Sequence, residues 1–147
     1  IFNIMAGLHP AYVSNNNDKE IDFVVENLKN YDCVAVGEIG IDLYWEKKFL
    51  DQQKLVFEKQ IELALNYNLP IVIHCREAFD HIYQILIKYS RNNLRGVFHC
   101  FTGNEEQANK KILIIFSTLS LALNSCLIFL YVNTDDIRKA TKVNKYR

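Results

Sequence analysis

The sequence lacks an excess of charge of either sign. Its 17 Lys and Arg residues balance 17 Asp and Glu residues, so the formal net charge is zero. A protein that holds nucleic acid regardless of its sequence or structure depends on a broad positive field, and this composition supplies none. Any contact with DNA must therefore be local.

Cys-x-x-Cys pairs are also missing. The cysteines lie far apart, and most of them fall in apolar runs: Cys33, Cys75, Cys100 and Cys126. This pattern favours buried reduced thiols over a disulfide framework. The chain opens at Ile1, with no signal peptide before its first motif. We therefore expect a cytoplasmic or nuclear protein whose printed sequence begins within a domain.

Half of the 147 residues are apolar, which suits a folded domain with a hydrophobic core. Short apolar runs alternate with segments of helical spacing. We expect strands at residues 2 to 7, 33 to 37, 71 to 75 and 96 to 100. We expect a helix with Asp18 as its N-cap that runs to about residue 28, and further helices at residues 50 to 68, 77 to 92 and 104 to 111. The alternation predicts an α/β fold with a parallel sheet, either a barrel or an open sheet. No glycine-rich dinucleotide fingerprint is present, which weakens the open-sheet version.

Three of the expected strands run directly into a side chain that can bind a metal. Glu38 follows the apolar run at residues 33 to 37, His74 the run at 71 to 73 and His99 the run at 96 to 98. The carboxyl ends of parallel strands in a barrel meet at one mouth, so these groups should converge. One carboxylate and two imidazoles suit zinc or manganese, whereas a site richer in carboxylate and water would suit magnesium.

Two polar residues near these positions each allow two interpretations. Asp42 either orients a metal ligand or makes an Asx-turn in its loop. Arg76 either offers its planar guanidinium to a phosphate or pairs with Glu77 or Asp80, and we favour the phosphate.

An aromatic pair, Tyr44 and Trp45, follows the second strand. Such rings can stack on a nucleobase, but packing against the neighbouring helix is the more common role, and we expect packing here.

Several motifs resemble those of a known family. Residues 37 to 42 read Gly-Glu-Ile-Gly-Ile-Asp and are followed by Gln53, Phe57 and the run Gln-Ile-Glu-Leu-Ala at 60 to 64. With residues 69 to 78 and 96 to 103, in the same order, they closely resemble the signatures of TatD-type metal-dependent deoxyribonucleases. The resemblance includes Gly-Leu-His-Pro at 7 to 10 and covers roughly residues 5 to 111.

The resemblance implies part of a (β/α)8 TIM barrel of the amidohydrolase type, with a two-metal site of Mg, Mn or Zn at its mouth. It implies hydrolysis of DNA, often from an end. Glu38 would bridge the metals, His74 and His99 would bind them, and His9 and Arg76 would act at the scissile phosphate.

The sequence departs from the family at both ends. The His-x-His pair of the family's first strand and its late Thr-Asp-Ser-Pro stretch do not occur here; Asp135 and Asp136 are the only late acidic candidates. We therefore expect the first strand and the last strands to be missing. Residues 1 to 111 would form the central part of the barrel, and residues 112 to 147 a divergent hydrophobic segment with a polar tail.

Two other functions remain open at this point. The same barrel and metals hydrolyse amides or lactones in related proteins. Alternatively, the chain is a catalytically dead remnant tethered by residues 112 to 132, an uncharged run long enough to cross a bilayer, although we favour this less. We expect DNA as substrate and no stable protein partner.

Overall fold

The computed structural model describes residues 3–89, 92, 94–99 and 106. Strands and helices alternate along the chain. In order, they are β1 (Ile4–Ala6), a short 3-10 helix η1 (Pro10–Tyr12), α1 (Asp18–Asn30), β2 (Cys33–Asp42), α2 (Leu50–Asn66), β3 (Ile71–Arg76), α3 (Phe79–Lys88) and β4 (Gly96–His99). The predicted α/β class is confirmed.

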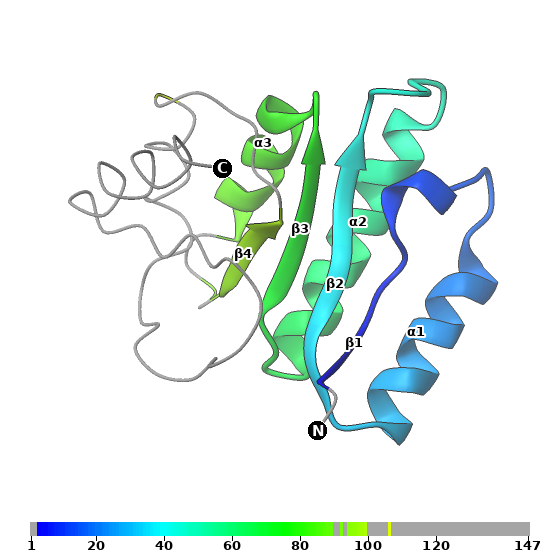
Figure 1. The fold of residues 1–147 in the computed structure, drawn as a ribbon, viewed down its shortest axis with the longest axis vertical. Helices are drawn as coiled ribbons and strands as arrows, with labels where there is room; N and C mark the ends of the chain where they lie inside the picture. The colour runs from blue at the N-terminus through cyan, green and yellow to red at the C-terminus, as the bar shows by residue number, and fades with distance from the viewer. Residues whose placement is uncertain (1–2, 90–91, 93, 100–105, 107–147) are drawn as a thin grey trace, which may run out of the picture.

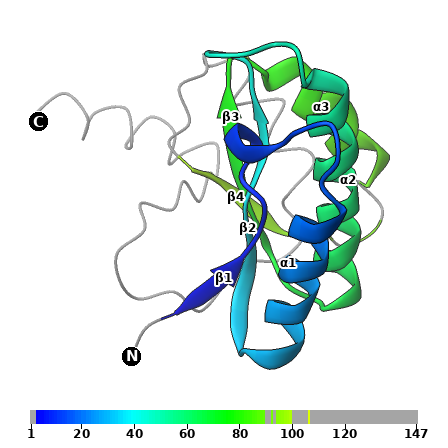
Figure 2. The same cartoon turned by 90° about the vertical axis from the view of Figure 1, so that its right-hand side faces the viewer.

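The described strands form one parallel sheet in the order β1-β2-β3-β4 (Figure 1). Helices α1, α2 and α3 lie on one face of this sheet (Figure 2). Parallel neighbours in sequence order, each followed by a helix, are the arrangement of a barrel wall.

Strand β2 shows how the sequence separates the two faces of the sheet. Ile39 and Ile41 are fully buried in the core that includes Phe57 and Ile61 of α2. Side chains alternate along a strand, so Glu38 and Asp42, on either side of this pair, project to the face without helices. Several fully buried side chains fill the layer between sheet and helices: Phe57, Ile39, Ile41, Ile61, Ile71, Ile73, Ile82 and Leu86.

Strand β2 is longer than predicted. We expected it to end at residue 37, where the short apolar run ends. Pairing with β3 carries it on to Asp42, with a register shift between Gly37 and Ile39. Glu38 therefore lies inside a strand rather than after one.

Helix boundaries differ from the prediction at two places. The N-cap of α1 is Asn17, so Asp18 is its first helical residue; the Asn17 side chain accepts a hydrogen bond from the Ser14 N–H instead of capping the helix. Helix α3 begins at Phe79, because Glu77 adopts a left-handed backbone with φ of 53°. The sequence pattern does not register such local backbone choices.

Some predictions fall on residues outside the described ranges. These are the helix at 104 to 111, the segment at 112 to 147 with its candidate span at 112 to 132, and Cys100 and Cys126. Within the described ranges, none of the helices combines the length and the apolar character that a bilayer span requires. Cys33 is buried and outside any disulfide, as predicted, and burial raises the pKa of its thiol. Cys75 is also outside any disulfide, but it is only partly buried, contrary to the prediction.

Candidate metal centre

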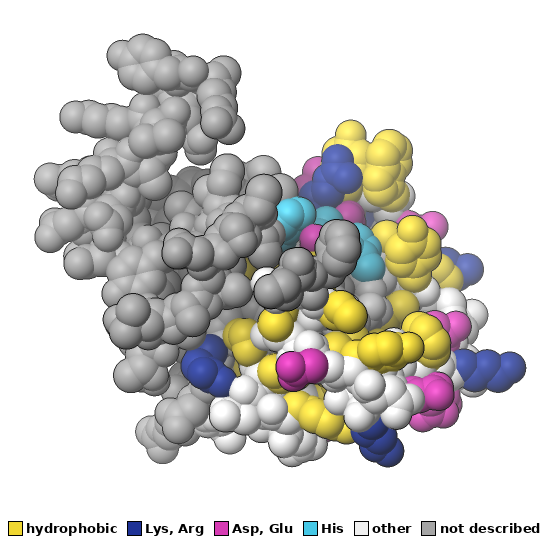
Figure 3. Space-filling model, turned by 60° about the horizontal axis from the view of Figure 1, so that its bottom comes forward, with side chains coloured by type: hydrophobic (Ala, Val, Ile, Leu, Met, Phe, Trp, Pro, Cys, Tyr) yellow, Lys and Arg dark blue, Asp and Glu magenta, His cyan; other side chains and the backbone are white. Residues whose placement is uncertain are grey.

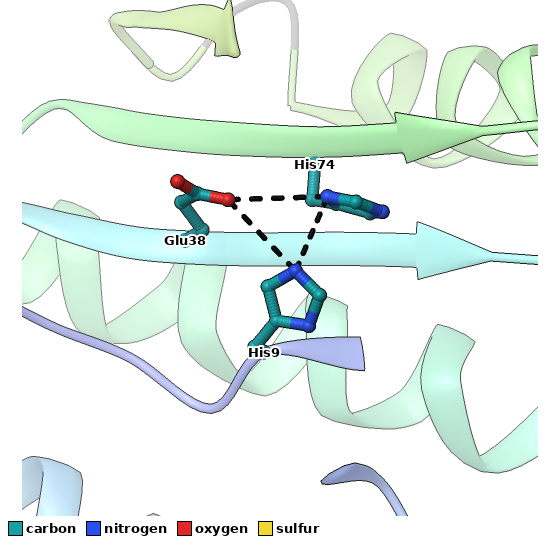
Figure 4. A group of neighbouring side chains, drawn as sticks. All are labelled: His9, Glu38 and His74. Carbon is teal, nitrogen blue, oxygen red and sulfur yellow. Dashed lines mark hydrogen bonds and ion pairs between the residues drawn. The ribbon is translucent and has the colours of Figure 1, made fainter. Parts of the chain in front are cut away.

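Three side chains converge on the sheet face opposite the helices: His9 from the loop before η1, Glu38 from β2 and His74 from β3 (Figure 4). The Nε2 atom of His9 lies 3.2 Å from Nδ1 of His74. An Oε2 atom of Glu38 lies 3.8 Å from the first of these nitrogens and 3.9 Å from the second. All three residues are partly buried.

His99 joins the cluster from the other side of Glu38. Its Nδ1 atom is 3.2 Å from Oε1 of Glu38, whereas Oε2 faces His9 and His74. The carboxylate therefore has a histidine environment on each of its two oxygens. Every predicted metal ligand and His9 thus share one site.

The donor set fits a divalent cation. Neighbouring donors around a tetrahedral zinc with bonds of about 2.0–2.1 Å stand about 3.4 Å apart. The separations of Glu38 from His99 and His74, 3.2 and 3.9 Å, bracket this value. A carboxylate with imidazole nitrogens suits zinc or manganese, so the donor types and their separations are both compatible with such an ion.

Asp42 orients His74. Its Oδ2 atom lies 2.8 Å from Nε2 of His74, where the imidazole N–H donates to the carboxylate. That bond leaves the lone pair of Nδ1 on the side of Glu38, as a metal ligand requires. The other oxygen, Oδ1, accepts the backbone N–H of Tyr44 at 2.9 Å. The Asx-turn of Asp42 is confirmed, and its contact with His74 is compatible with the other interpretation.

His9 is held in the same tautomer as His74, with its proton on Nε2. The backbone N–H of Ala11 donates to its Nδ1 at 3.1 Å, so Nδ1 carries no proton and Nε2 must carry one. Burial lowers the pKa of His9, and the neighbouring His74 lowers it further. The Nε2–H of this neutral ring donates to the bare Nδ1 of His74, 3.2 Å away, so His9 is a hydrogen-bond donor in the cluster rather than a metal ligand. This favours the phosphate contact predicted for His9 over a place among the ligands.

Two buried glutamines of α2 fix the backbone that carries the site. Gln60 accepts the Leu8 N–H at 2.6 Å and donates to the Leu8 carbonyl at 3.1 Å. Gln53 does the same for Asp42, at 2.9 and 3.2 Å. The sequence analysis assigned no role to either glutamine. They could have been found in the sequence as two polar residues, seven positions apart, on the apolar face of an amphipathic helix, because buried polar side chains need hydrogen-bond partners.

Replacement of Gln60 by leucine should destabilise the protein by about 2–4 kcal/mol, because both backbone groups of buried Leu8 lose their partners. Urea unfolding measures this loss. The Gln84→Leu change on the exposed side of α3 serves as the control and should alter the unfolding free energy by less than about 0.5 kcal/mol. Equal midpoints for the two variants would show that the Gln60 contacts contribute little.

Arg76 lies at the rim of the cluster. Its guanidinium carbon is 3.5 Å from the ring centroid of Tyr44 and 5.9 Å from that of Trp45. The prediction that the aromatic pair packs against a helix is wrong: Trp45 is 80% exposed and Tyr44 is 47% exposed. The loop turns outward because Asp42 holds the Tyr44 N–H.

Comparisons with known proteins give a consistent result. The model of the family described as TatD-related DNase matches residues 2–128. The metal-dependent hydrolase YabD of Bacillus subtilis is 38% identical over 104 residues, which are 71% of this chain and 41% of YabD. The 3′-5′ ssDNA/RNA exonuclease TatD of a Pantoea species is 34% identical over 102 residues, or 69% of this chain and 39% of that enzyme.

Among solved structures, the TatD homologue YjjV of Escherichia coli superposes with a TM-score of 0.69 at 29% identity. The match covers 76% of this chain and 44% of YjjV. The chain spans about two fifths of the length of the curated relatives it matches.

Proposed function

The chain belongs to the TatD-related DNase family, and from that membership we propose that its cluster is the metal and phosphate centre of a hydrolase that cleaves DNA phosphodiester bonds. Its fold is part of the (β/α)8 barrel of this family. The carrying observation is the position of Glu38, whose two oxygens each face a different histidine environment.

We assign Glu38 as the bridging carboxylate of a two-metal site, with His74 through Nδ1 and His99 as further ligands. Magnesium, manganese and zinc are the candidate ions. When bound, such ions lower the pKa of a coordinated water and neutralise charge on phosphoryl oxygens. Asp42 keeps the His74 ring in the orientation that presents its lone pair.

His9 and Arg76 act on the substrate in this proposal. An ion on Nδ1 of His74 would take away the acceptor that the Nε2–H of His9 now faces, and this N–H would then donate to a phosphate oxygen. The Ala11 N–H keeps the ring in the tautomer that makes this possible. Arg76 supplies a positive charge whose position is restricted by the Tyr44 ring. Because the chain has no net charge, these local donors replace a general positive surface.

An amidohydrolase or lactonase function is less well supported. An imidazole donor and an arginine at the mouth of the site favour an anionic group such as a phosphate, whereas an amide or lactone is neutral. The name of the Pantoea relative, a ssDNA/RNA exonuclease, points to nucleic acid as the substrate class. We propose that cleavage starts from an end of the strand. We also propose that the protein works in the cytoplasm or nucleus, because thiols such as that of Cys33 stay reduced there.

The test is metal-dependent cleavage of a DNA strand labelled at one end. The full-length protein, freed of metal by a chelator, should be inactive and regain activity with Mg²⁺, Mn²⁺ or Zn²⁺. Products that shorten one nucleotide at a time would support attack from an end. Unchanged DNA with all three metals, alongside turnover of an amide or lactone, would overturn the proposal.

A further inference from the structure

The rim of the metal centre carries an aromatic pair that the chemistry above does not use. The rings of Tyr44 and Trp45 meet edge to face, with centroids 4.7 Å apart and planes at 89°. The guanidinium of Arg76 lies on the Tyr44 ring. Figure 3 shows exposed hydrophobic side chains, with basic ones beside them, close to the histidines on one face of the molecule.

These rings are exposed although burial would be favourable. Tryptophan is the largest apolar side chain, and Trp45 leaves 80% of its surface in water. An aromatic side chain held outward next to a candidate catalytic centre is available to a ligand with a flat apolar face.

Hydrogen bonds fix the position of this aromatic pair relative to the metal centre. The Tyr44 N–H donates to Asp42, which also holds His74. Buried Leu43, between them, donates its N–H to the Arg76 carbonyl at 3.0 Å. Arg76 follows His74 by two residues on β3, so the two side chains project from the same face of that strand. A ligand stacked on the rings therefore lies next to the metal centre.

We propose that Tyr44, Trp45 and Arg76 form a stacking platform that binds an unpaired nucleobase of the nucleotide beside the scissile phosphate. The inference rests on the proposed function and deepens it, because it names the residues that would hold the base of an unpaired nucleotide next to the metal centre. A base inside a duplex has both faces stacked and cannot occupy the platform. Arg76 serves twice, with its flat face on Tyr44 and its N–H edge directed to a phosphate.

Trp45 also provides the test, because it is the only tryptophan among the 147 residues. The Mg²⁺-loaded chain is titrated with oligothymidylate, with a base-free deoxyribose-phosphate oligomer of equal length, and with a blunt duplex. Tryptophan fluorescence should fall with oligothymidylate and stay constant with the other two. Equal quenching by the base-free oligomer would overturn the platform, since phosphate contacts alone would then explain binding.

Kinetics give an independent measure. In the wild-type protein, KM for the base-free oligomer should exceed KM for oligothymidylate by about tenfold or more. This ratio should collapse towards one in Trp45→Ala and persist in Phe23→Ala, which removes an aromatic ring that is 65% exposed on α1. An unchanged ratio in Trp45→Ala contradicts the platform even if cleavage is normal. Failure of the wild-type protein to cleave any oligomer contradicts the proposed function instead, and the fluorescence titration still decides on stacking.

Discussion

Glu38→Gln should lower the rate of DNA cleavage by more than about 100-fold. The change keeps the size of the side chain but removes the negative charge that two histidine environments share. Changes to residues that only orient metal ligands already cost about 10–100-fold, so loss of a bridging ligand should cost more. Single-turnover cleavage at saturating metal measures the chemical step, and calorimetric titration with Mn²⁺ should show weaker binding. His74→Ala should have a similar effect.

The control for this experiment is Glu26→Gln, which removes one negative charge from an exposed position of α1. Its activity should match that of the wild type. Because Glu38 is only partly buried, its variant should keep the far-ultraviolet circular dichroism of the wild type and unfold within about 1 kcal/mol of it. Full activity of folded Glu38→Gln would remove the bridging role.

Local pattern was enough to predict the order of the described strands and α-helices and the gathering of three polar side chains from neighbouring strands. The spacing of apolar residues at 50 to 66 and the apolar run at 71 to 73 both arise because these segments are buried against neighbouring elements. Burial requires apolar side chains, so it is visible in the sequence. The convergence of Glu38, His74 and His99 followed from the parallel sheet alone.

Contacts between residues far apart in the chain could not be predicted from the sequence pattern. The sequence does not record that Gln60 meets Leu8, 52 positions away, or that His9 reaches His74 across 65 positions. The Ala11 N–H that fixes the tautomer of His9 depends on the turn of η1, a backbone choice with no side-chain signature. The stacking of Arg76 on Tyr44 likewise depends on the pairing of Asp42 with Arg76 between β2 and β3.

Among substitutions that add a single methyl group to the sheet, Gly40→Ala should lower the free energy of unfolding the most. Gly40 has φ of 145°, a region that residues with a Cβ almost never adopt. It pairs with His74, and an added Cβ would lie 2.1 Å from the His74 carbonyl oxygen. To relieve this contact, β2 must separate from β3, which breaks ladder hydrogen bonds and moves Glu38 and Asp42 away from His74. We expect a loss on the order of 3–5 kcal/mol in the free energy of unfolding.

Thermal and urea unfolding measure the loss, with Val34→Ala as the control because it also changes one side chain of β2, at a position that is 40% exposed. That control should cost less than about 1 kcal/mol. Any Gly40→Ala protein that still folds should bind Mn²⁺ more weakly, because the strand spacing that sets the ligand separations has changed. Wild-type stability and metal affinity in Gly40→Ala would mean that the close approach of β2 and β3 does not define the site.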